Sequence, residues 1–327
     1  MFTSKITGTG SYLPEKILSN ADLEKMVDTN NEWIVERTGI LERRIASPQE
    51  NTTDLAAKAS LQAIEAAGIQ PTDIDFILFA TTSPDRTMPN AASVLQTKIG
   101  AGHCPALDIY AACTGFLYGH SLADQMIASG AYRNILVVGA EILSRYTDYT
   151  DRGTCILFGD GAGAAIISRS DNEDSKVYSH KLRSDGEHGE LLTLNGGGSQ
   201  NPASAETVKD KLHYVKMEGR EVFKLATRTM AKTSAEVLEK AGLSADQVDW
   251  LVPHQANLRI IELVAKKFNF PMEKVIVEIE KMGNSSAATI PLCLDKAIRD
   301  GRIKRGHNIL LTAFGGGLTS GSLLLRY

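Results

Sequence analysis

An internal duplication constrains the fold of this chain more than any other feature of its sequence. Residues 57–78 (AKASLQAIEAAGIQPTDIDFIL) and 231–252 (AKTSAEVLEKAGLSADQVDWLV) align without a gap at an offset of 174 residues, and 7 of the 22 positions are identical. Each copy has the pattern of an amphipathic helix, a glycine that ends it, a short loop and a buried strand. A unit of about 170 residues is too long for a solenoid repeat, so the duplication predicts two similar α/β halves.

A second pair of segments supports this interpretation. FGDGAGAAII (158–167) is similar to FGGGLTSGSLLL (314–325), and in each a glycine-rich turn precedes a strand of small residues. The polar stretch 168–176 lies between the copies, so we expect an N-terminal half of residues 1–172 and a C-terminal half of residues 173–327. Strands that alternate with helices predict parallel or mixed sheets covered by helices.

Composition excludes several classes of protein. A chain of 327 residues with 43% hydrophobic content can bury a sizeable core. The formal net charge of −4 argues against a general nucleic-acid binder. The N-terminus carries no apolar signal-peptide core, and no apolar run reaches membrane-spanning length, so we expect a cytoplasmic protein without a membrane partner.

The four cysteines favour neither a zinc site nor a dithiol redox motif. Cys104, Cys113, Cys155 and Cys293 form no C-x-x-C pair, and no cluster of histidines, cysteines and carboxylates has metal-ligand spacing. We therefore predict no metal. Cys155 and Cys293 lie in apolar runs, and we expect them in the core.

Cys113 lies at a predicted strand-to-helix junction. A β-prone run over residues 106–110 leads through two alanines to Cys113, and a proline-free stretch predicts a helix from about Thr114 to Ser129. A cysteine in the first turn of a helix faces unpaired N–H groups and the positive end of the helix dipole. Both favour the thiolate, which is the nucleophilic form. The alternative at this point is a small buried apolar residue.

Two further residues are candidates for chemistry. His254 ends the strand of the second copy, and active sites of α/β folds collect at the carboxyl ends of strands. Asn284 precedes a possible helix in GNSSAATIPLCL (283–294), a position that is similar to that of Cys113. The alternatives are a structural histidine and a helix N-cap. The glycines of 159–164 loosely fit a dinucleotide-binding pattern, but a strand follows where that pattern needs a helix.

With Cys113, His254 and Asn284 assembled, the chain resembles the β-ketoacyl-[acyl-carrier-protein] synthase III family, thiolase-fold condensing enzymes that initiate bacterial fatty acid synthesis. The resemblance implies an α/β, thiolase-like fold in which two duplicated halves form a layered αβαβα core. It covers nearly the whole chain. The segments that carry it occur in order: ITGTGSYLPEK (6–16), NEWIVERTGILERR (31–44), AACTGFLYG (111–119), DRGTCILFGDGAGA (151–164), KMEGREVFKLA (216–226), HQANLRI (254–260), GNSSAA (283–288) and FGGGLTSGS (314–322).

The resemblance implies an acyltransferase with a Cys-His-Asn triad. Cys113 would attack the thioester of an acyl-CoA and hold the acyl group. His254 and Asn284 would donate hydrogen bonds to the thioester oxygen of malonyl-acyl carrier protein as carbon dioxide departs. The N–H groups of Cys113 and Gly316 would form the oxyanion hole. No cofactor is implied, because acyl-CoA is a substrate.

The resemblance also implies binding residues for coenzyme A and for the acyl chain. Trp33, Arg37 and Arg152 match the residues that hold the adenine and phosphates of CoA, for which an aromatic face and guanidinium groups are suited. Met88 matches a position that reaches the acyl pocket of the partner subunit, so we expect a homodimer. The starter acyl group is expected to be acetyl or another short chain, which is the usual preference of the family.

A basic helix face is the expected docking site for the acyl carrier protein. Arg259, Lys266 and Lys267 share one face of a helix predicted over 257–268, and the resemblance adds Gln255 to this site. Carrier proteins are acidic, and complementary charge steers docking. There are three alternatives to the condensing function. The first is a relative with the same triad, a starter-unit synthase or acyltransferase of polyketide or alkylquinolone biosynthesis. The second is a non-catalytic thiolase-fold partner subunit, and the third is a cysteine hydrolase, which the pairing of a histidine with Asn284 rather than with a carboxylate disfavours.

Overall fold

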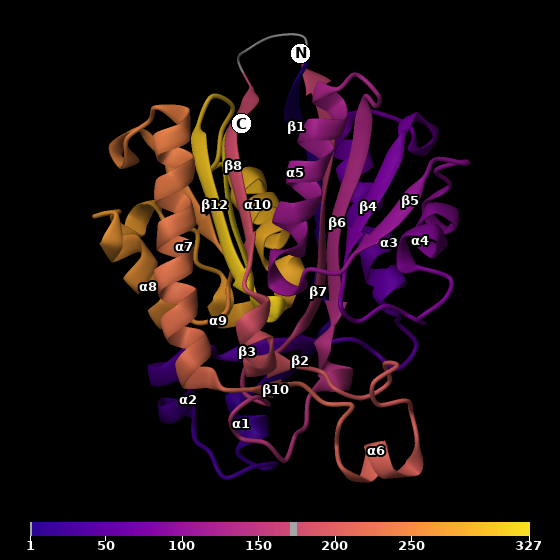
Figure 1. Ribbon diagram of the computed structural model, residues 1–327, viewed down its shortest axis with the longest axis vertical. Helices are drawn as coiled ribbons and strands as arrows, with labels where there is room; N and C mark the ends of the chain where they lie inside the picture. The colour runs from indigo at the N-terminus through magenta and orange to yellow at the C-terminus, as the bar shows by residue number, and fades with distance from the viewer. Residues whose placement is uncertain (1, 171–174) are drawn as a thin grey trace.

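Two β-sheets, one from each copy of the duplication, form the framework of the protein (Figure 1). The computed structural model describes residues 2–170 and 175–327. The expected boundary between residues 172 and 173 therefore lies outside the described residues. The strands of the first sheet all precede this gap, and the strands of the second sheet all follow it.

Both sheets are mixed, as the alternation of strands and helices predicts. The first has the order β1-β7-β6-β4-β5, in which β4 runs parallel to β5 and β6, and β7 runs antiparallel to β1 and β6. The second has the order β11-β12-β13-β8, in which β11 and β12 run parallel and the other pairs antiparallel. The strands are β1 (Thr3–Tyr12), β4 (Phe76–Ala80), β5 (Ala106–Ile109), β6 (Asn134–Ile142), β7 (Asp160–Ser170), β8 (Lys176–Ser184), β11 (Trp250–Pro253), β12 (Asn308–Gly315) and β13 (Thr319–Arg326).

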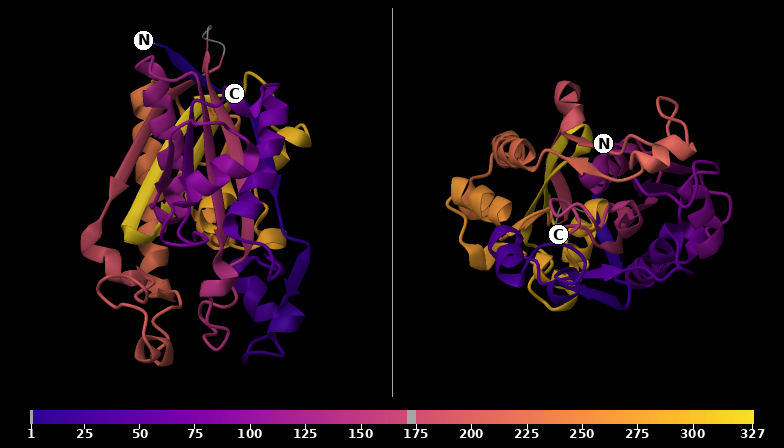
Figure 2. Two further views of the ribbon diagram at one scale, coloured as in Figure 1. Left: turned by 90° about the vertical axis from the view of Figure 1, so that its right-hand side faces the viewer. Right: turned by 90° about the horizontal axis from the view of Figure 1, so that it is seen from below.

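Helices cover both faces of each sheet and so build five layers. Two helices, α5 and α10, lie between the sheets and contact both of them. Helices α3 and α4 cover the outer face of the first sheet, and α7 and α8 lie beyond the second, so the two outer layers are at opposite sides of the molecule (Figure 2). The helices are α3 (Thr52–Ala67), α4 (Ala91–Ile99), α5 (Gly115–Ala128), α7 (Gly219–Ala241), α8 (Leu258–Lys267) and α10 (Thr289–Arg299). This is the αβαβα arrangement that the resemblance implies.

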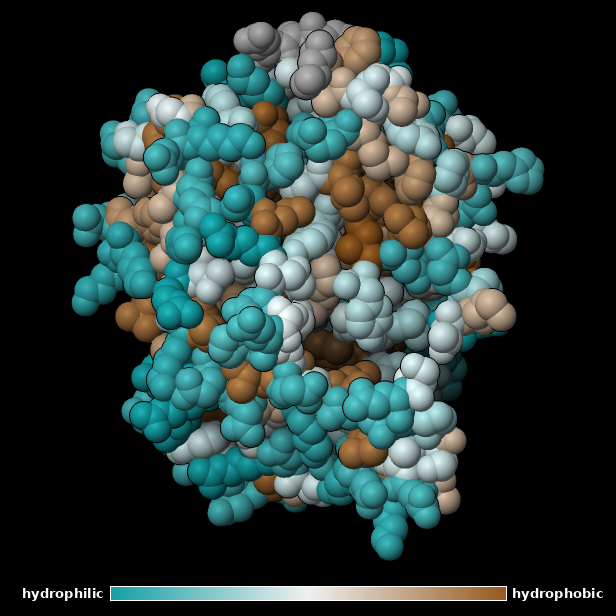
Figure 3. Space-filling model, viewed as in Figure 1, coloured by the Kyte–Doolittle hydropathy of each residue, from teal (hydrophilic) through white to brown (hydrophobic). Residues whose placement is uncertain are grey.

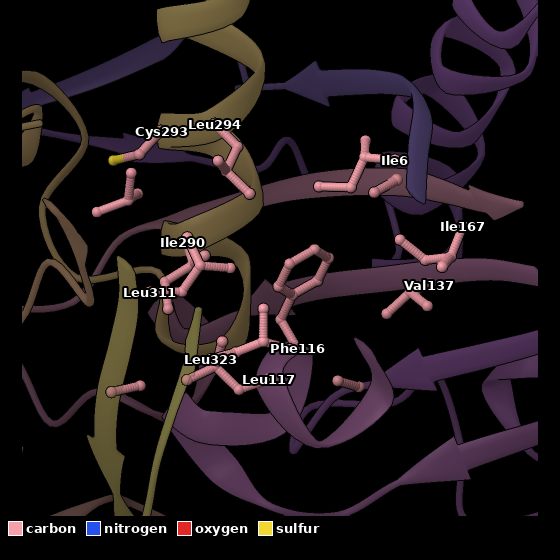
Figure 4. Packing of buried hydrophobic residues seen from close by; sticks show 14 of the residues in the cluster. Ile6, Phe116, Leu117, Val137, Ile167, Ile290, Cys293, Leu294, Leu311 and Leu323 are labelled. Carbon is pink, nitrogen blue, oxygen red and sulfur yellow. The ribbon is translucent and has the colours of Figure 1, made fainter. Parts of the chain in front are cut away.

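The central helices hold the two sheets together through one continuous hydrophobic core (Figure 4). Phe116 and Leu117 project from α5, and Ile290 and Leu294 from α10, toward side chains of both sheets. Burial of such side chains stabilises a fold by about 1.5–3 kcal/mol each. Cys293 is 0% exposed in this core and Cys155 is 1% exposed in another cluster, which confirms the expectation for both.

The duplication is visible in matching helix ends and hydrogen bonds. Helix α3 ends at Gly68 with φ 66° and α7 ends at Gly242 with φ 67°, a left-handed conformation that glycine adopts at least cost. The Asp75 carboxylate accepts from the Asn134 N–H at 2.8 Å where β6 begins. The Asp249 carboxylate accepts from the Asn308 N–H at 2.8 Å where β12 begins. All of these pairs keep the offset of 174 residues.

The same offset relates the two turns that enter the central helices. The 3₁₀ turn η2 (Ala112–Thr114) precedes α5, and η7 (Ser286–Ala288) precedes α10. Their first residues share a left-handed backbone, with φ 44° at Ala112 and 48° at Ser286. The counterpart of Cys113 is therefore Ala287, and the counterpart of Asn284 is Tyr110. The expectation that Asn284 occupies a position similar to that of Cys113 is wrong. Asn284 lies before the turn η7, three residues ahead of the true counterpart of Cys113.

Most of the remaining short elements gather at one end of the sheets, below them in Figure 1. Two of these elements, α2 and β10, carry residues next to the candidate site described below. The elements are β2 (Lys16–Ser19), α1 (Asn20–Leu23), α2 (Asn31–Thr38), β3 (Glu42–Ile45), β9 (Leu192–Thr193), α6 (Ala205–Lys209), β10 (Lys216–Met217) and α9 (Ile279–Met282). Among the described residues, no helix is both long and apolar enough to cross a lipid bilayer.

Candidate active site

Cys113 is held by a strained turn at the start of the central helix α5. The preceding residue, Ala112, has φ 44°, a conformation that costs an L-residue about 1 kcal/mol. Gly315, at the end of β12, lies against the backbone of Cys113. A Cβ atom on residue 315 would stand 2.7 Å from the Cys113 nitrogen, so this contact requires glycine. The turn and the neighbouring strand together fix where the Cys113 side chain lies.

Two cavities meet at Cys113. The larger has a volume of about 440 Å³ and a mainly apolar wall that includes Tyr110, Leu143 and Tyr146. The smaller has a volume of about 100 Å³ and lies between α7 and α8 on one side and Cys113 on the other. Cys113 lines both. The space-filling view shows a hollow below α5 with hydrophobic residues at its base (Figure 3). Cys113 is thus reached from two cavities, a narrow one and a wider one with a mainly apolar wall.

His254 reaches the smaller cavity from the carboxyl end of β11, as the sequence predicts. Its backbone N–H donates to the Thr312 carbonyl at 2.8 Å, which continues the pairing of β11 with β12. Its side chain is buried, and the Nδ1 atom lies 2.6 Å from the Thr289 hydroxyl. Burial lowers the pKa of His254 to about 3, so the imidazole is neutral at physiological pH.

Asn284 lines the same cavity on the side of the N-terminal half. Its backbone N–H donates to the Leu157 carbonyl at 2.9 Å. Its Oδ1 atom accepts from the Ser286 N–H at 2.9 Å. Because the oxygen is occupied in this way, the amide group has its two Nδ2–H donors left for a ligand.

The ionisation of Cys113 differs from the expectation. Burial raises the pKa of the Cys113 thiol to about 12, and the negative charge of Glu141 raises it further, while a hydrogen bond with the Ser286 hydroxyl lowers it. Glu141 is itself buried and accepts from the Thr82 N–H at 3.0 Å and from neighbouring hydroxyl groups. The raised pKa therefore favours the thiol form of the resting residue.

Gly316 lies on the same wall as Cys113. Both line the larger cavity, and Gly316 is the first residue of the turn that joins β12 to β13. A Cβ atom at position 316 would meet its nearest neighbours at 3.5 Å, so space alone does not require glycine there. The two N–H groups expected in the oxyanion hole thus belong to residues on one wall of the cavity.

Comparison with known proteins decides the family. The sequence model described as 3-oxoacyl-[acyl-carrier-protein (ACP)] synthase III matches residues 107–186, and its C-terminal counterpart matches residues 238–327. Beta-ketoacyl-[acyl-carrier-protein] synthase III of Shigella dysenteriae is 51% identical over 327 residues, which cover 100% of both chains. The chain belongs to the β-ketoacyl-[acyl-carrier-protein] synthase III family. It is therefore an acyltransferase, a condensing enzyme of fatty acid biosynthesis.

Other relatives of the synthase agree in sequence and fold. The protein of the same name from Caldanaerobacter subterraneus is 50% identical over 98% of this chain and 97% of its own. The crystal structure of 3-oxoacyl-[acyl-carrier-protein] synthase III from Aquifex aeolicus covers 99% of this chain and 100% of that one, with a TM-score of 0.93 and 47% identity. The priming β-ketosynthase of the R1128 polyketide pathway has a TM-score of 0.92 and 34% identity over 99% and 96% of the two chains. The thiolase-like fold is thus confirmed.

The structure brings the three residues expected at the CoA site of the synthase together. Trp33 lies on α2, and the guanidinium carbons of Arg37 and Arg152 lie 4.7 and 4.2 Å from the centre of its ring. Arg152 comes from a loop more than a hundred residues further along and also donates to the Asp28 carbonyl at 3.1 Å. Asn257, which lines the smaller cavity, donates to the Arg37 carbonyl at 2.8 Å, so this cluster adjoins the cavity.

The structure contradicts the expectation that Gln255 contacts the acyl carrier protein. Gln255 is 0% exposed, so its side chain cannot contact a carrier protein. Its amide nitrogen donates to the carbonyls of Pro253 and Ile276, and its oxygen accepts from the N–H groups of Glu278 and Ile279. Gln255 therefore ties the end of β11 to the neighbouring segment.

The other expected contact residues are accessible. Arg259, Lys266 and Lys267 are exposed on α8. Arg259 also lies 5.6 Å from the ring of Phe223 on α7. Met88 is 85% exposed and lines neither cavity of its own chain.

The sequence did not point to several residues that surround Cys113 and His254. Ser286 and Glu141 set the environment of the Cys113 thiol, Thr289 contacts His254, and Phe314 lines the smaller cavity. The internal duplication could have pointed to two of these residues, Ser286 and Thr289. At the offset of 174, Ser286 matches Ala112 and Thr289 matches Gly115, so Ser286 lies in the turn that is equivalent to the one around Cys113 and Thr289 directly follows it.

Proposed function

We propose that this synthase condenses a short acyl-CoA, such as acetyl-CoA, with malonyl-acyl carrier protein to give a 3-oxoacyl-acyl carrier protein, with Cys113, His254 and Asn284 as catalytic residues. One observation carries the proposal: Cys113 stands where the two cavities meet, and His254 and Asn284 line the narrow one. Cys113 comes from the N-terminal half (1–172) and the other two from the C-terminal half (173–327), so the reaction needs both halves.

In the first half-reaction, the thioester of the acyl-CoA enters by the narrow cavity. The Cys113 sulfur attacks its carbonyl carbon, the bond from that carbon to the CoA sulfur breaks, and the thiol proton leaves with CoA. The N–H groups of Cys113 and Gly316 stabilise the oxyanion of the intermediate. Removal of one such donor typically costs about 10²–10³ in rate. The acyl chain then lies in the apolar cavity.

In the second half-reaction, malonyl-acyl carrier protein takes the place of CoA. Carbon dioxide leaves, and the electron pair of the broken carbon–carbon bond forms an enolate. Hydrogen bonds from His254 and the Asn284 amide stabilise the enolate oxygen. The enolate carbon then attacks the acyl carbonyl, the bond to the Cys113 sulfur breaks, and the sulfur regains a proton from water.

Trp33, Arg37 and Arg152 are proposed to bind the adenine and phosphates of CoA. The cation–π contacts of both arginines with Trp33 support this role, because the same flat faces and positive charges suit a purine and its phosphates. At 4.2 Å, Arg152 lies directly against the ring. A base that inserts between the two side chains must therefore first displace the Arg152 guanidinium.

The basic face of α8 is proposed to dock the acyl carrier protein. Helix α8 begins at the rim of the narrow cavity, where Asn257 and Ile260 line the wall. Arg259, Lys266 and Lys267 are exposed on this helix, so an acidic carrier would be held with its prosthetic arm near the entrance.

We further propose a homodimer that pairs through β5. This strand is the edge of the first sheet, and exposed edges are commonly covered by another chain. Leu107 and Tyr110 beside this edge are 49% and 73% exposed, and Met88 is 85% exposed. In such a dimer Met88 closes the acyl cavity of the partner subunit. The reaction is assigned to the cytoplasm, where a free thiol such as that of Cys113 stays reduced.

A panel of acyl-CoA donors from acetyl to octanoyl, each with malonyl-acyl carrier protein, tests the choice of substrate by mass analysis of the products. We expect acetyl-CoA to give the fastest condensation. A starter-unit synthase is the second candidate, and the volume of about 440 Å³ favours it, because this cavity has more room than an acetyl group fills. Condensation with longer donors alone, or with malonyl-CoA in place of the carrier-bound form, would select the second candidate.

A further inference from the structure

A third cavity lies between helix α7 and the second sheet, and we call it the α7 pocket. Helix α7 packs against β8, β12 and β13 of this sheet (Figure 1). The cavity has a volume of about 570 Å³, within the range of about 300–1,000 Å³ that is usual for small-molecule sites. Of its described lining residues, only Phe314 also lines a cavity that meets Cys113. The α7 pocket is therefore distinct from the proposed path of the acyl-CoA.

The sheet supplies the base of the pocket. Phe314 on β12 is directly opposite Ser320 on β13, and Ser320 is directly opposite Arg183 on β8. Residues that are opposite each other on neighbouring strands present their side chains on the same face of a sheet. Phe314 is 6% exposed, and Ser320 and Leu318 are each 2% exposed. The base is therefore buried and apolar, with one hydroxyl group between a phenyl ring and a guanidinium group.

The hydroxyl group of Ser320 is without a partner. It lines the pocket and forms no hydrogen bond with any residue that the structure describes, although the residue is 98% buried. Buried polar groups are almost always hydrogen-bonded, because an unsatisfied one lowers stability. A ligand oxygen that accepts from Ser320 would remove this deficit.

Helix α7 supplies a positively charged rim. Four residues of one helix face, three, four and seven positions apart, line the pocket: Leu225, Arg228, Thr229 and Lys232. Arg228 and Lys232 are exposed, and within the described part of the chain neither forms an ion pair. These two cations are one helical turn apart, so a single anion can contact both of them.

The other charged groups of the lining already have partners. Arg183 donates through Nη2 to Glu236 Oε1 at 2.7 Å, which compensates its charge. Asp185 is exposed, and its carboxylate lies 3.0 Å from Nδ1 of His188. The unpaired charge of the pocket is therefore the positive charge on the side of α7.

We propose that the α7 pocket binds a phosphate monoester whose carbon part is apolar. A phosphate monoester carries about 1.5–2 negative charges at pH 7 and three acceptor oxygens, so Arg228 and Lys232 can bind it together. The apolar base contacts the carbon part, and the Ser320 hydroxyl donates to the ester oxygen that joins the two parts. The inference goes beyond the proposed function, because none of the proposed catalytic residues lines this pocket.

Calorimetric titration of the unmodified protein with hexyl phosphate tests the class of ligand. Inorganic phosphate, hexanol and hexanoate are the comparison compounds, since they lack the carbon chain, the charge and the phosphate in turn. We expect hexyl phosphate to bind at least about tenfold more tightly than each of them. No binding of hexyl phosphate would refute the site. Equal binding of inorganic phosphate would refute the apolar base as a contact, and equal binding of hexanoate would refute the preference for phosphate.

Variants of exposed residues locate the site, and their exposure lets us expect folded proteins. Arg228→Ala and Lys232→Ala should each weaken the binding of hexyl phosphate about tenfold. Lys240→Ala is the matched control, because Lys240 is exposed on the same helix and lies outside the pocket. Trp33→Ala should also bind as the unmodified protein does. Unchanged binding in both pocket variants, or an equal loss in Lys240→Ala, would overturn the proposal. A loss in Trp33→Ala alone would place the phosphate at the proposed CoA site instead.

Discussion

Replacement of Gly315 by alanine should disable acylation of Cys113 and leave most of the fold intact. Residue 315 has φ −155° and ψ −178°, an extended conformation that alanine adopts freely, so the effect is one of space alone. The added methyl carbon would lie 2.7 Å from the Cys113 nitrogen and 3.2 Å from its Cα and Cβ atoms. These neighbours are backbone atoms of Cys113 and its Cβ atom, which cannot rotate away from the added methyl group.

The size of the effect follows from the shortfall in distance. Ordinary contact of a Cβ atom begins at 3.4 Å, so the two segments must separate by up to about 0.7 Å, the difference from 2.7 Å. Overpacking of this kind costs about 1–3 kcal/mol. Oxyanion donors act only within about 2.7–3.1 Å of the developing charge, and loss of one costs about 10²–10³ in rate. We therefore expect acylation to slow by about 10²-fold, with the melting temperature lowered by a few degrees.

Single-turnover acylation by acetyl-CoA, followed by intact mass and paired with thermal unfolding, measures both effects. Gly186→Ala is the matched control, since a Cβ atom there would meet nothing within 4 Å. The control should acylate at the rate of the unmodified protein. Unchanged acylation in Gly315→Ala, or a loss that only tracks the amount of unfolded protein, would show that the contact between residues 315 and 113 does not control acylation.

Three further predictions follow from the structure. His120 is 0% exposed, both of its ring nitrogens lack a hydrogen-bond partner, and burial lowers its pKa to about 4. Between pH 6.5 and pH 4, His120 is therefore protonated in the unfolded chain but neutral in the folded chain. The free energy of unfolding falls by about 3 kcal/mol as the pH is lowered through this range. His120→Leu should remove this loss in denaturant unfolding at pH 5 and pH 8; an equal dependence on pH in both proteins would contradict the prediction. Trp33→Ala should raise KM for acetyl-CoA about tenfold and leave KM for the malonyl carrier unchanged; the reverse pattern in steady-state kinetics would move the CoA site elsewhere. Arg259→Ala should raise KM for the malonyl carrier in a salt-dependent way. Gln255→Ala should instead lower the free energy of unfolding by about 1–3 kcal/mol. A Gln255→Ala protein that is stable but binds the carrier weakly would show that Gln255 is a docking residue after all.

The duplication predicts the architecture because both copies carry the same local signals. A helix that ends at Gly68 or Gly242, followed by a strand that begins after Asp75 or Asp249, is recognisable in the sequence, and the structure repeats it bond for bond. Parallel and mixed sheets with helices on both faces follow from that order of elements. The layered fold could therefore be predicted from the sequence.

The direction and environment of single side chains could not be predicted in the same way. Gln255 stands one residue after His254, and no pattern reveals that its amide turns inward to bind four backbone groups. The pKa of Cys113 depends on burial, which exists only in the folded chain, and on Glu141, which lies on the strand β6. The local sequence shows only that Cys113 lies near the start of a helix, which predicts a lowered rather than a raised pKa.

We propose that Cys113 carries the acyl group while His254 and Asn284 serve the decarboxylation. Intact-mass analysis after incubation with acetyl-CoA, combined with carbon dioxide release from malonyl-acyl carrier protein, tests it most directly. We expect one acetyl adduct on the unmodified protein and none on Cys113→Ala. We expect His254→Ala and Asn284→Ala to gain the adduct but to release carbon dioxide about 10²-fold more slowly. An adduct that persists in Cys113→Ala, or carbon dioxide release that is unchanged in both other variants, would contradict it.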